Sequence, residues 1–207
     1  MTPFTKLTAV AAPIDEPNVD TNQLCPTRFN KVPRGPQYAQ ILFHDRRFHA
    51  DGSEKDHILN RELFRRAQII VADRNWGCGS SRESAVYALY EFGIRCVIAP
   101  SFGDIHANNC SKNGLLPVVL TETECAAIRK QLHDRSGAAL TVDLAAQTVT
   151  DVAGTVHRFD IHPVRKKSLL EGLDDITRTR QYAEKIEGFE EAYRQERPWL
   201  YERKEAS

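Results

Sequence analysis

The chain has 207 residues, enough for one domain of ordinary size with its own hydrophobic core. Its 28 Lys and Arg residues balance its 28 Asp and Glu residues, so the overall charge does not favour a nucleic acid or a membrane surface as a partner. The N-terminus lacks the pattern of a secretory signal and no apolar run approaches the roughly 20 residues that cross a bilayer, so we expect a soluble, cytoplasmic protein.

The first 120 residues alternate between strand-like and helix-like segments. Residues 6–14 predict a first strand, and residues 15–36, which contain four prolines, predict a long ordered loop. Short apolar, β-branched runs predict further strands at 68–73, 95–100 and 116–120, with helix-like segments between them at 81–92 and 101–111. This alternation indicates an α/β core with some parallel strand pairing.

The rest of the chain predicts a helix, a hairpin layer and a helical tail. The helix is expected at about 121–134, and residues 140–161 predict two or three short strands joined by tight turns. The tail from 163 to 195 is charged and helical in pattern. We therefore expect residues 1–207 to form a single domain with a helical C-terminal tail over about 163–207.

The chain has five cysteines, an odd number, and no C-x-x-C pair that could bind zinc or an iron–sulfur cluster. They are Cys25, Cys78, Cys96, Cys110 and Cys125. We therefore expect no metal or cofactor on this chain, and any metal that its chemistry needs is expected on another chain.

The segment NWGCGSSRE (75–83) lies at the carboxyl end of the strand predicted at 68–73 and leads into a predicted helix. Ligands of open α/β sheets bind at such strand ends, and a helix N-terminus offers unpaired N–H groups to an anion. An arginine in the first helical turn opposes the helix dipole, so Arg82 favours a bound anion. The pattern suits a carboxylate or a phosphate.

A purely structural interpretation of the same segment stays open. Ser80 and Glu83 have the S-x-x-E spacing of a capping box, and Gly77 and Gly79 can serve only to turn the chain. The segment matches neither a phosphate-binding P-loop, nor a G-x-S-x-G nucleophile elbow, nor a dinucleotide fingerprint. Cys78 could have a lowered pKa at a helix start, although buried structural cysteines are commoner.

Four stretches of the sequence carry a family resemblance: NVDTNQLCPTRF (18–29), NWGCGSSRE (75–83), IAPSFGDIHANNCSKNGLLPV (98–118) and GLDDI (172–176). Together they resemble the small subunit of 3-isopropylmalate dehydratase, the free-standing equivalent of the swivelling domain of aconitase. The resemblance runs from about residue 4 to the tail. It implies an aconitase-type swivelling β/β/α fold, with a mixed, partly parallel sheet flanked by helices.

The resemblance also implies a hydro-lyase that interconverts 2-isopropylmalate and 3-isopropylmalate by dehydration and rehydration in leucine biosynthesis. Ser80 matches the family's serine base, Ser81 its neighbour in the oxyanion region and Arg82 the clamp on a carboxylate of the dicarboxylate substrate, with Gly79 beside them. The family's [4Fe-4S] cluster lies on a large subunit. The resemblance therefore implies a heterodimer or heterotetramer with that subunit, and a chain that is inactive alone.

The long loop departs from the family pattern at positions that bear on the substrate. Residues 26–34 are where relatives choose between an isopropyl group, a methyl group or a third carboxylate. Asn30 stands where leucine is usual, and an unpaired amide against an apolar group costs about 1 to 3 kcal/mol. Asn22 and Ser84 replace the usual aspartate and histidine. Two arginines of this loop are expected as secondary carboxylate contacts: Arg28 and Arg34.

Several alternatives stay open. The chain could serve a related dehydratase acting on methylmalate, citraconate or dimethylmalate, or be a non-catalytic binding or regulatory swivel module. Near-zero net charge argues against RNA binding, and retention of Ser80 with Arg82 argues against lost catalysis. His106 matches a family position near the domain interface, although a lone histidine on a helix is more often packed or solvated. The basic tract 162–168 either contacts the large subunit or substrate or forms a solvated helix face.

Overall fold

The computed structural model describes residues 1–79 and 82–201, and one mixed β-sheet lies at its centre. The strands among the described residues are β1 (Lys6–Ile14), β2 (Ile69–Ala72), β3 (Cys96–Ala99), β4 (Leu116–Val119), β5 (Ala139–Asp143), β6 (Thr148–Thr150) and β7 (Val156–Arg158), in the sheet order β4-β3-β2-β1-β5-β6-β7. Strands β1 to β4 run parallel, and β5, β6 and β7 each run antiparallel to their neighbours. The predicted mixed, partly parallel sheet is therefore confirmed.

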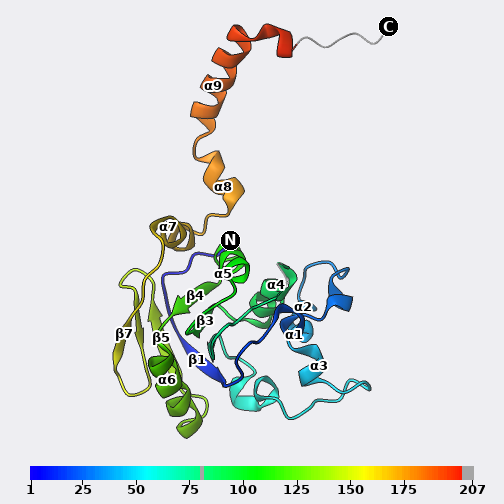
Figure 1. Ribbon diagram of the computed structural model, residues 1–207, viewed down its shortest axis with the longest axis vertical. Helices are drawn as coiled ribbons and strands as arrows, with labels where there is room; N and C mark the ends of the chain where they lie inside the picture. The colour runs from blue at the N-terminus through cyan, green and yellow to red at the C-terminus, as the bar shows by residue number, and fades with distance from the viewer. Residues whose placement is uncertain (80–81, 202–207) are drawn as a thin grey trace.

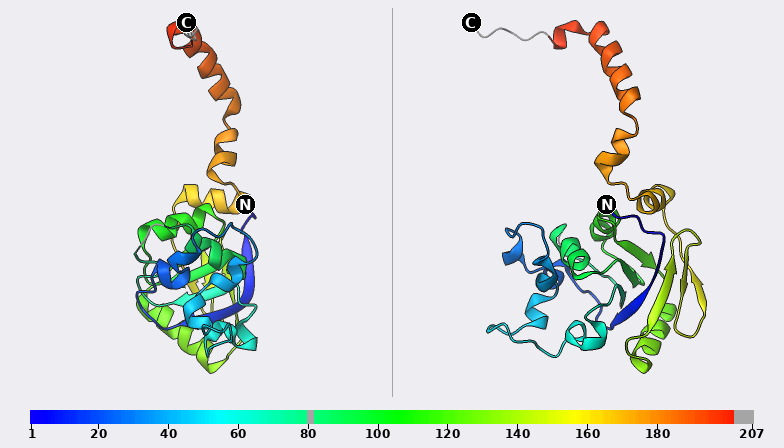
Figure 2. Two further views of the ribbon diagram at one scale, coloured as in Figure 1. Left: turned by 90° about the vertical axis from the view of Figure 1, so that its right-hand side faces the viewer. Right: turned by 180° about the vertical axis from the view of Figure 1, so that it is seen from behind.

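Helices cover both faces of the parallel part of the sheet (Figures 1 and 2). Helix α4 (Ser84–Phe92) packs on one face, and helix α6 (Glu122–Asp134) packs on the other. Strands β2 and β3 are consequently buried along their whole length, which explains why they are continuous apolar runs in the sequence. Helix α5 (Asp104–Lys112) connects β3 to β4.

The segment between β1 and β2 contains more helix than its sequence pattern indicates. Within the predicted loop 15–36 lie α1 (Thr21–Leu24) and a short 3-10 helix (Thr27–Phe29). Residues 37–67, for which the pattern predicts no element, contain α2 (Tyr38–Ile41), α3 (His44–Arg47) and two 3-10 turns (Ile58–Asn60 and Glu62–Phe64). These short helices bury aromatic and aliphatic side chains against the face of the sheet that α4 also covers.

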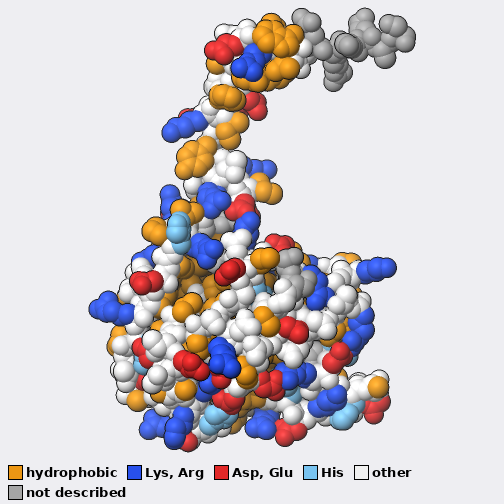
Figure 3. Space-filling view, in the orientation of Figure 1, with side chains coloured by type: hydrophobic (Ala, Val, Ile, Leu, Met, Phe, Trp, Pro, Cys, Tyr) orange, Lys and Arg blue, Asp and Glu red, His pale blue; other side chains and the backbone are white. Residues whose placement is uncertain are grey.

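The C-terminal tail is helical, as predicted, but most of it leaves the body of the protein. Helix α7 (Pro163–Glu171) packs on the body through the buried Leu169, whereas α8 (Asp175–Arg180), α9 (Ala183–Glu196) and a final 3-10 turn (Pro198–Leu200) project away from it (Figures 1 and 2). The apolar side chains of this projecting arm are exposed, as Figure 3 shows: Ile176, Tyr182, Ile186, Phe189, Trp199, Leu200 and Tyr201. Among residues 1–79 and 82–201, no helix has the length and apolar character to span a membrane.

The hairpin layer is joined to α6 by a buried ion-pair cluster around His157. Its Nδ1 lies 3.0 Å from Glu124 Oε1 and its Nε2 lies 3.2 Å from Asp151 Oδ2. Burial alone would lower the pKa of His157, but the hydrogen bonds and charges of Glu124 and Asp151 outweigh it and raise that pKa. The protonated imidazole therefore stabilises the contact between the hairpin and the helix.

We expect the free energy of unfolding to contain a His157 contribution that disappears at alkaline pH. Because the folded-state pKa of His157 is raised, this contribution is complete below the unfolded pKa of about 6.5 and is lost as the pH rises through the folded pKa. Urea unfolding of the wild type and of His157→Gln, measured at pH values below the unfolded pKa and above the folded pKa of His157, tests this expectation. The stability difference between the two proteins should shrink as the pH rises; a difference independent of pH would contradict the assignment.

Candidate active site

Three loops meet at the carboxyl ends of the parallel strands β1, β2 and β3. They are residues 18–21, 75–79 and 101–103, and backbone hydrogen bonds join them: Gly77 N–H donates to Val19 O at 2.7 Å, Thr21 N–H to Cys78 O at 3.0 Å, Trp76 N–H to Ser101 O at 3.0 Å and Gly103 N–H to Trp76 O at 2.9 Å. The loop after β2 is therefore held between the loops that follow its two neighbouring strands. This arrangement places the predicted G-C-G segment at the expected edge of the sheet.

Two glycines are required where these loops cross. Gly77 has φ +70°, and a Cβ at that position would collide with the ring of His106. A Cβ on Gly103 would lie 2.6 Å from the carbonyl oxygen of Gly77. Gly79, with φ +88°, also adopts a left-handed backbone conformation, although a Cβ at this position would not collide with a neighbouring atom. The glycines allow the loops to pack backbone against backbone.

His106 lies beneath this glycine turn and is 2% exposed. Neither ring nitrogen has a hydrogen-bond partner among the described residues, and burial lowers the pKa of His106 to about 4, so the imidazole is neutral near neutral pH. Of the two interpretations from the sequence, the structure supports packing inside the fold.

Helix α4 begins later than the sequence predicts. Its first residue is Ser84 and its N-cap is Glu83, which makes no side-chain capping bond. The Glu83 carboxylate accepts a hydrogen bond from Tyr87 Oη at 2.6 Å. The placement of Arg82 in the first helical turn is wrong, since Arg82 precedes the N-cap. The capping-box interpretation depends on Ser80 and stays a prediction. Ser80 and Ser81 lie outside the described residues.

Among the described residues, Arg82 makes one hydrogen bond and has one buried donor without a partner. Its Nη1 donates to Thr27 Oγ1 at 2.8 Å, and its Nε is buried without a hydrogen-bond partner in the described structure. No ion pair joins it to an acidic side chain within the part of the chain that the structure describes. A buried, unpaired donor on a charged group is costly, so Arg82 is suited to bind an anion.

The three polar departures from the family pattern lie around Arg82. Asn22 Oδ1 accepts hydrogen bonds from the backbone N–H and the hydroxyl of Thr27, at 2.9 and 2.8 Å. Ser84 Oγ donates to Asn30 Oδ1 at 3.1 Å. Thr27 was not predicted as a site residue from the sequence. The one indication of its role was its position in the P-T-R-F run of the predicted substrate loop.

The other two predicted arginines contact acidic side chains of this chain. Arg28 forms a bidentate pair with Asp45, and this hydrogen bonding lowers the pKa of Asp45 to about 2. Arg34 donates to Glu91 Oε1 at 3.2 Å and lies over the Tyr87 ring, so it joins the loop to the far part of α4. Their role as secondary carboxylate contacts stays a prediction, and in this structure neither shares a partner with Arg82.

The cysteine thiols are not arranged as metal ligands or nucleophiles. Burial raises the pKa of Cys25, Cys96, Cys110 and Cys125, and Cys78 also has a raised pKa, from burial and from the charge of Asp20. Cys78 is therefore not an activated thiolate. Among the described residues, no three His, Cys, Asp or Glu side chains come together as a metal site. The described part of this chain does not offer a ligand set for an iron–sulfur cluster.

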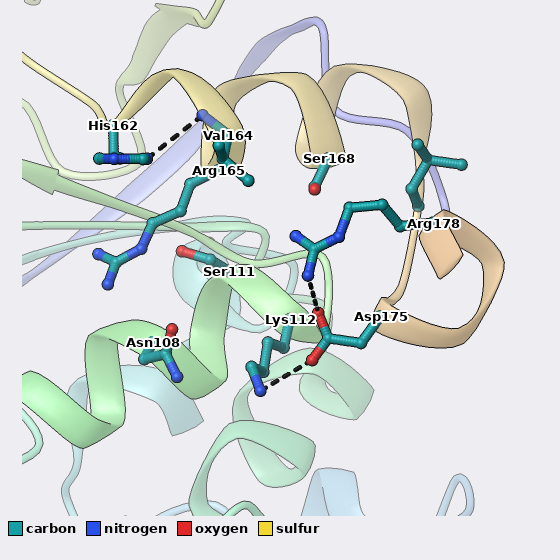
Figure 4. Close-up of a pocket in the computed structure, with 10 residues that line it drawn as sticks. Asn108, Ser111, Lys112, His162, Val164, Arg165, Ser168, Asp175 and Arg178 are labelled. Carbon is teal, nitrogen blue, oxygen red and sulfur yellow. Dashed lines mark hydrogen bonds and ion pairs between the residues drawn. The ribbon is translucent and has the colours of Figure 1, made fainter. Parts of the chain in front are cut away.

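A separate hollow of about 450 Å³ lies between α5, α7 and α8, and it includes none of the residues discussed above as substrate contacts. Figure 4 shows Lys112 and Arg178 both reaching Asp175, at 2.8 and 2.9 Å, while the Arg165 side chain extends into the space between α5 and α7. Two of the three cations that line the hollow are therefore paired with the same carboxylate. Part of the basic tract 162–168 lines this hollow, and its predicted contact with a partner or substrate stays a prediction.

The sheet, its two helical layers and the three-loop edge define an aconitase-type swivelling domain, and a family model described as the aconitase C-terminal domain matches residues 1–123. A model described as LeuD_N matches residues 126–163, and one described as the C-terminal domain of the 3-isopropylmalate dehydratase small subunit matches residues 175–203. The chain belongs to the family of 3-isopropylmalate dehydratase small subunits.

Relatives of that family cover almost the whole chain. The small subunits of 3-isopropylmalate dehydratase from Roseobacter denitrificans and Paramagnetospirillum magneticum are each 46% identical over 201 residues, which is 97% of this chain and 100% of theirs. The Neisseria gonorrhoeae small subunit is 44% identical over 211 aligned residues, covering 97% of this chain and 99% of its own. A crystal structure of 3-isopropylmalate dehydratase (leuD) from Methanocaldococcus jannaschii matches 88% of this chain and 99% of its own with a TM-score of 0.63 at 21% identity, which confirms the fold.

Proposed function

We propose that this chain is the small subunit of a heteromeric hydro-lyase that interconverts 2-isopropylmalate and 3-isopropylmalate in leucine biosynthesis. Relatives that carry the name of this enzyme's small subunit align with almost the full length of the chain. The proposal rests on the environment of Arg82, which follows the 75–79 loop. Its Nε is buried and has no hydrogen-bond partner among the described residues. A substrate carboxylate supplies the acceptor that this donor lacks.

The proton chemistry is assigned to the G-S-S-R segment. Arg82 binds a carboxylate of the substrate and fixes its position, and Ser80 removes the proton on the carbon next to the departing hydroxyl. A serine is a weak base unless nearby donors and a cation stabilise its alkoxide. Arg82, two residues along the chain, provides that cation, and Ser81 is assigned to the oxyanion region. The support for both serines is the sequence match, since they lie outside the described residues.

The complete active site needs a second chain. A large subunit holding a [4Fe-4S] cluster supplies the Lewis acid for the hydroxyl that leaves, and the two chains form a heterodimer or heterotetramer. The scattered cysteines of this chain, which include no C-x-x-C pair, support the placement of the cluster on the partner. Free cysteines also suit the reducing cytoplasm, where we place the enzyme.

The contact between Asn30 and Ser84 bears on which malate derivative is used. The carbonyl oxygen of Asn30 accepts a hydrogen bond from Ser84 Oγ, so this end of the amide is satisfied within the chain. An isopropyl group beside the loop therefore meets a smaller penalty than an unpaired amide would impose. The amide nitrogen still favours a smaller or more polar substituent over an isopropyl group, and a related dehydratase for methylmalate, with its smaller methyl group, is the second candidate.

We expect the purified chain to dehydrate no substrate and the mixture with its cluster-loaded large subunit to interconvert the two isopropylmalates. The physical reason is that this chain holds the carboxylate clamp, while the Lewis acid comes from the partner. The assay measures kcat/KM for 2-isopropylmalate, 3-isopropylmalate and a methylmalate with each chain alone and together. Activity from this chain alone would contradict the proposal that two chains share the active site. A preference for the methylmalate would favour the second candidate.

A further inference from the structure

The hydrogen bonds to Thr27 determine which end of the Asn22 side-chain amide faces Thr27. Its Oδ1 accepts from the backbone N–H of Thr27 at 2.9 Å, and a backbone N–H can only donate. The amide oxygen, and not the amide nitrogen, must therefore face Thr27. The same oxygen lies 2.8 Å from the Thr27 hydroxyl, which must then donate its proton to it.

The orientation of the Thr27 hydroxyl in turn affects Arg82. A hydroxyl has one proton and two lone pairs, and the proton is used by Asn22. A lone pair of Thr27 Oγ1 is therefore directed to Arg82 Nη1, which donates to it at 2.8 Å. The three side chains form a hydrogen-bonded series from Asn22 through Thr27 to Arg82.

This series occupies Nη1 of the guanidinium and leaves Nε without a partner among the described residues. An arginine presents a pair of parallel donors along the Nε and Nη2 edge, and a carboxylate can bind both. Thr27 holds Nη1, and Nε is the buried donor that has no partner among the described residues. We propose that Thr27 and Asn22 are positioning residues that hold Arg82 at Nη1 and so fix its guanidinium for pairing with a substrate carboxylate, an inference that rests on the proposed function.

The series is anchored to the same loop that carries Arg82. Asn22 lies on α1, whose capping box joins Asp20 and Gln23 at 2.7 and 3.0 Å. The Thr21 N–H donates to Cys78 O at 3.0 Å, so α1 is fixed to the G-C-G turn. Figure 1 shows α1 beside α4, the helix that follows Arg82, and the two helices are in contact. Thr27 therefore contacts Arg82 from a segment that is hydrogen-bonded through α1 to the 75–79 loop.

The first test uses activity in the complex with the large subunit. Thr27→Val removes the hydroxyl at nearly constant shape, and the loss of a hydrogen bond to a charged group is expected to lower kcat/KM roughly 10- to 100-fold. Thr27→Ser keeps the hydroxyl and should restore most of the activity. Thr8→Val is the matched control, because it removes an exposed threonine hydroxyl that bonds Thr141 elsewhere on the sheet.

A double-mutant cycle separates positioning from a direct effect on the substrate. If Thr27 acts through Arg82, then Thr27→Val should cost little in an Arg82→Ala background, although it costs much in the wild type. Asn22→Ala should reproduce the Thr27→Val defect, and the two should not add. Equal losses from Thr27→Val in both backgrounds would overturn the proposal.

The second test needs no turnover and therefore separates failure of this inference from failure of the proposed function. In the isolated chain, a guanidinium held at Nη1 should show separate ¹⁵N signals for its two Nη groups, assigned to Arg82 by their absence in Arg82→Lys. Thr27→Val should merge them by allowing rotation, and Thr27→Ser should keep them apart. Signals that Thr27→Val leaves unchanged would overturn the positioning role whatever the substrate of the enzyme is.

Discussion

Replacing Ser80 with asparagine is expected to reduce turnover of the reconstituted enzyme by about 10³-fold or more, the range for losing a positioned proton-transfer group. Asparagine can accept a hydrogen bond but cannot remove a proton from carbon and return it. Because Glu83 is the N-cap of α4, the substitution removes no cap from that helix, and the melting temperature and association with the large subunit should be nearly unchanged.

Ser136→Asn, on an exposed turn after α6, is the matched control for Ser80→Asn and should retain wild-type turnover. Steady-state kinetics with both isopropylmalates, together with thermal unfolding of each variant, provide the comparison. Near wild-type turnover in Ser80→Asn would mean that another group is the base.

Replacing Arg82 with lysine is expected to lower kcat/KM about 10²-fold or more, the scale of a lost charge-assisted contact worth about 3 kcal/mol. Lysine keeps the charge, but its single ammonium cannot bond Thr27 and both carboxylate oxygens as the planar guanidinium can. The effect should be strongest for substrates with both carboxylates intact.

The matched control is Arg65→Lys. Arg65 makes a bidentate contact to Glu54 on the surface and belongs to none of the three loops at the candidate site. It should leave the kinetics of the complex unchanged. Wild-type kcat/KM in Arg82→Lys would contradict the carboxylate clamp.

The strands could be predicted from the sequence because burial determines their composition. Strands β2 and β3 have helices on both faces and therefore consist of apolar and β-branched residues without alternation. Residues 37–67 could not be predicted in the same way. Helices of four residues span barely more than one turn of 3.6 residues and so show no repeating pattern, and their formation depends on contacts with the face of the sheet that α4 also covers.

The start of α4 shows how a correct local pattern can give a wrong boundary. The sequence pattern predicts a helix from residue 81, whereas α4 begins at Ser84 with Glu83 as its N-cap. The Glu83 carboxylate bonds Tyr87 one turn into the helix, a contact that the pattern does not show. The position of the G-C-G segment at the edge of the sheet was nevertheless predicted correctly, because it follows directly from the strand before it.

Contacts between distant segments account for what the sequence could not show about the site. Thr27 and Arg82 are 55 positions apart, and Arg34 and Glu91 are 57 apart. Sequence spacing indicated that arginines of the long loop were available, but not which acidic side chains pair with them. The fold shows that Arg28 and Arg34 have such partners and that Arg82 lacks one among the described residues.

The central claim is that this chain brings the base and the carboxylate clamp to a site that a second chain completes. Exchange of the substrate's carbon-bound proton with deuterated solvent tests it most directly, because exchange reports proton removal even when net dehydration is slow. We expect rapid exchange by the wild-type complex, none by either chain alone, and loss of exchange in Ser80→Asn. Exchange at the wild-type rate in Ser80→Asn, or by the large subunit alone, would contradict it.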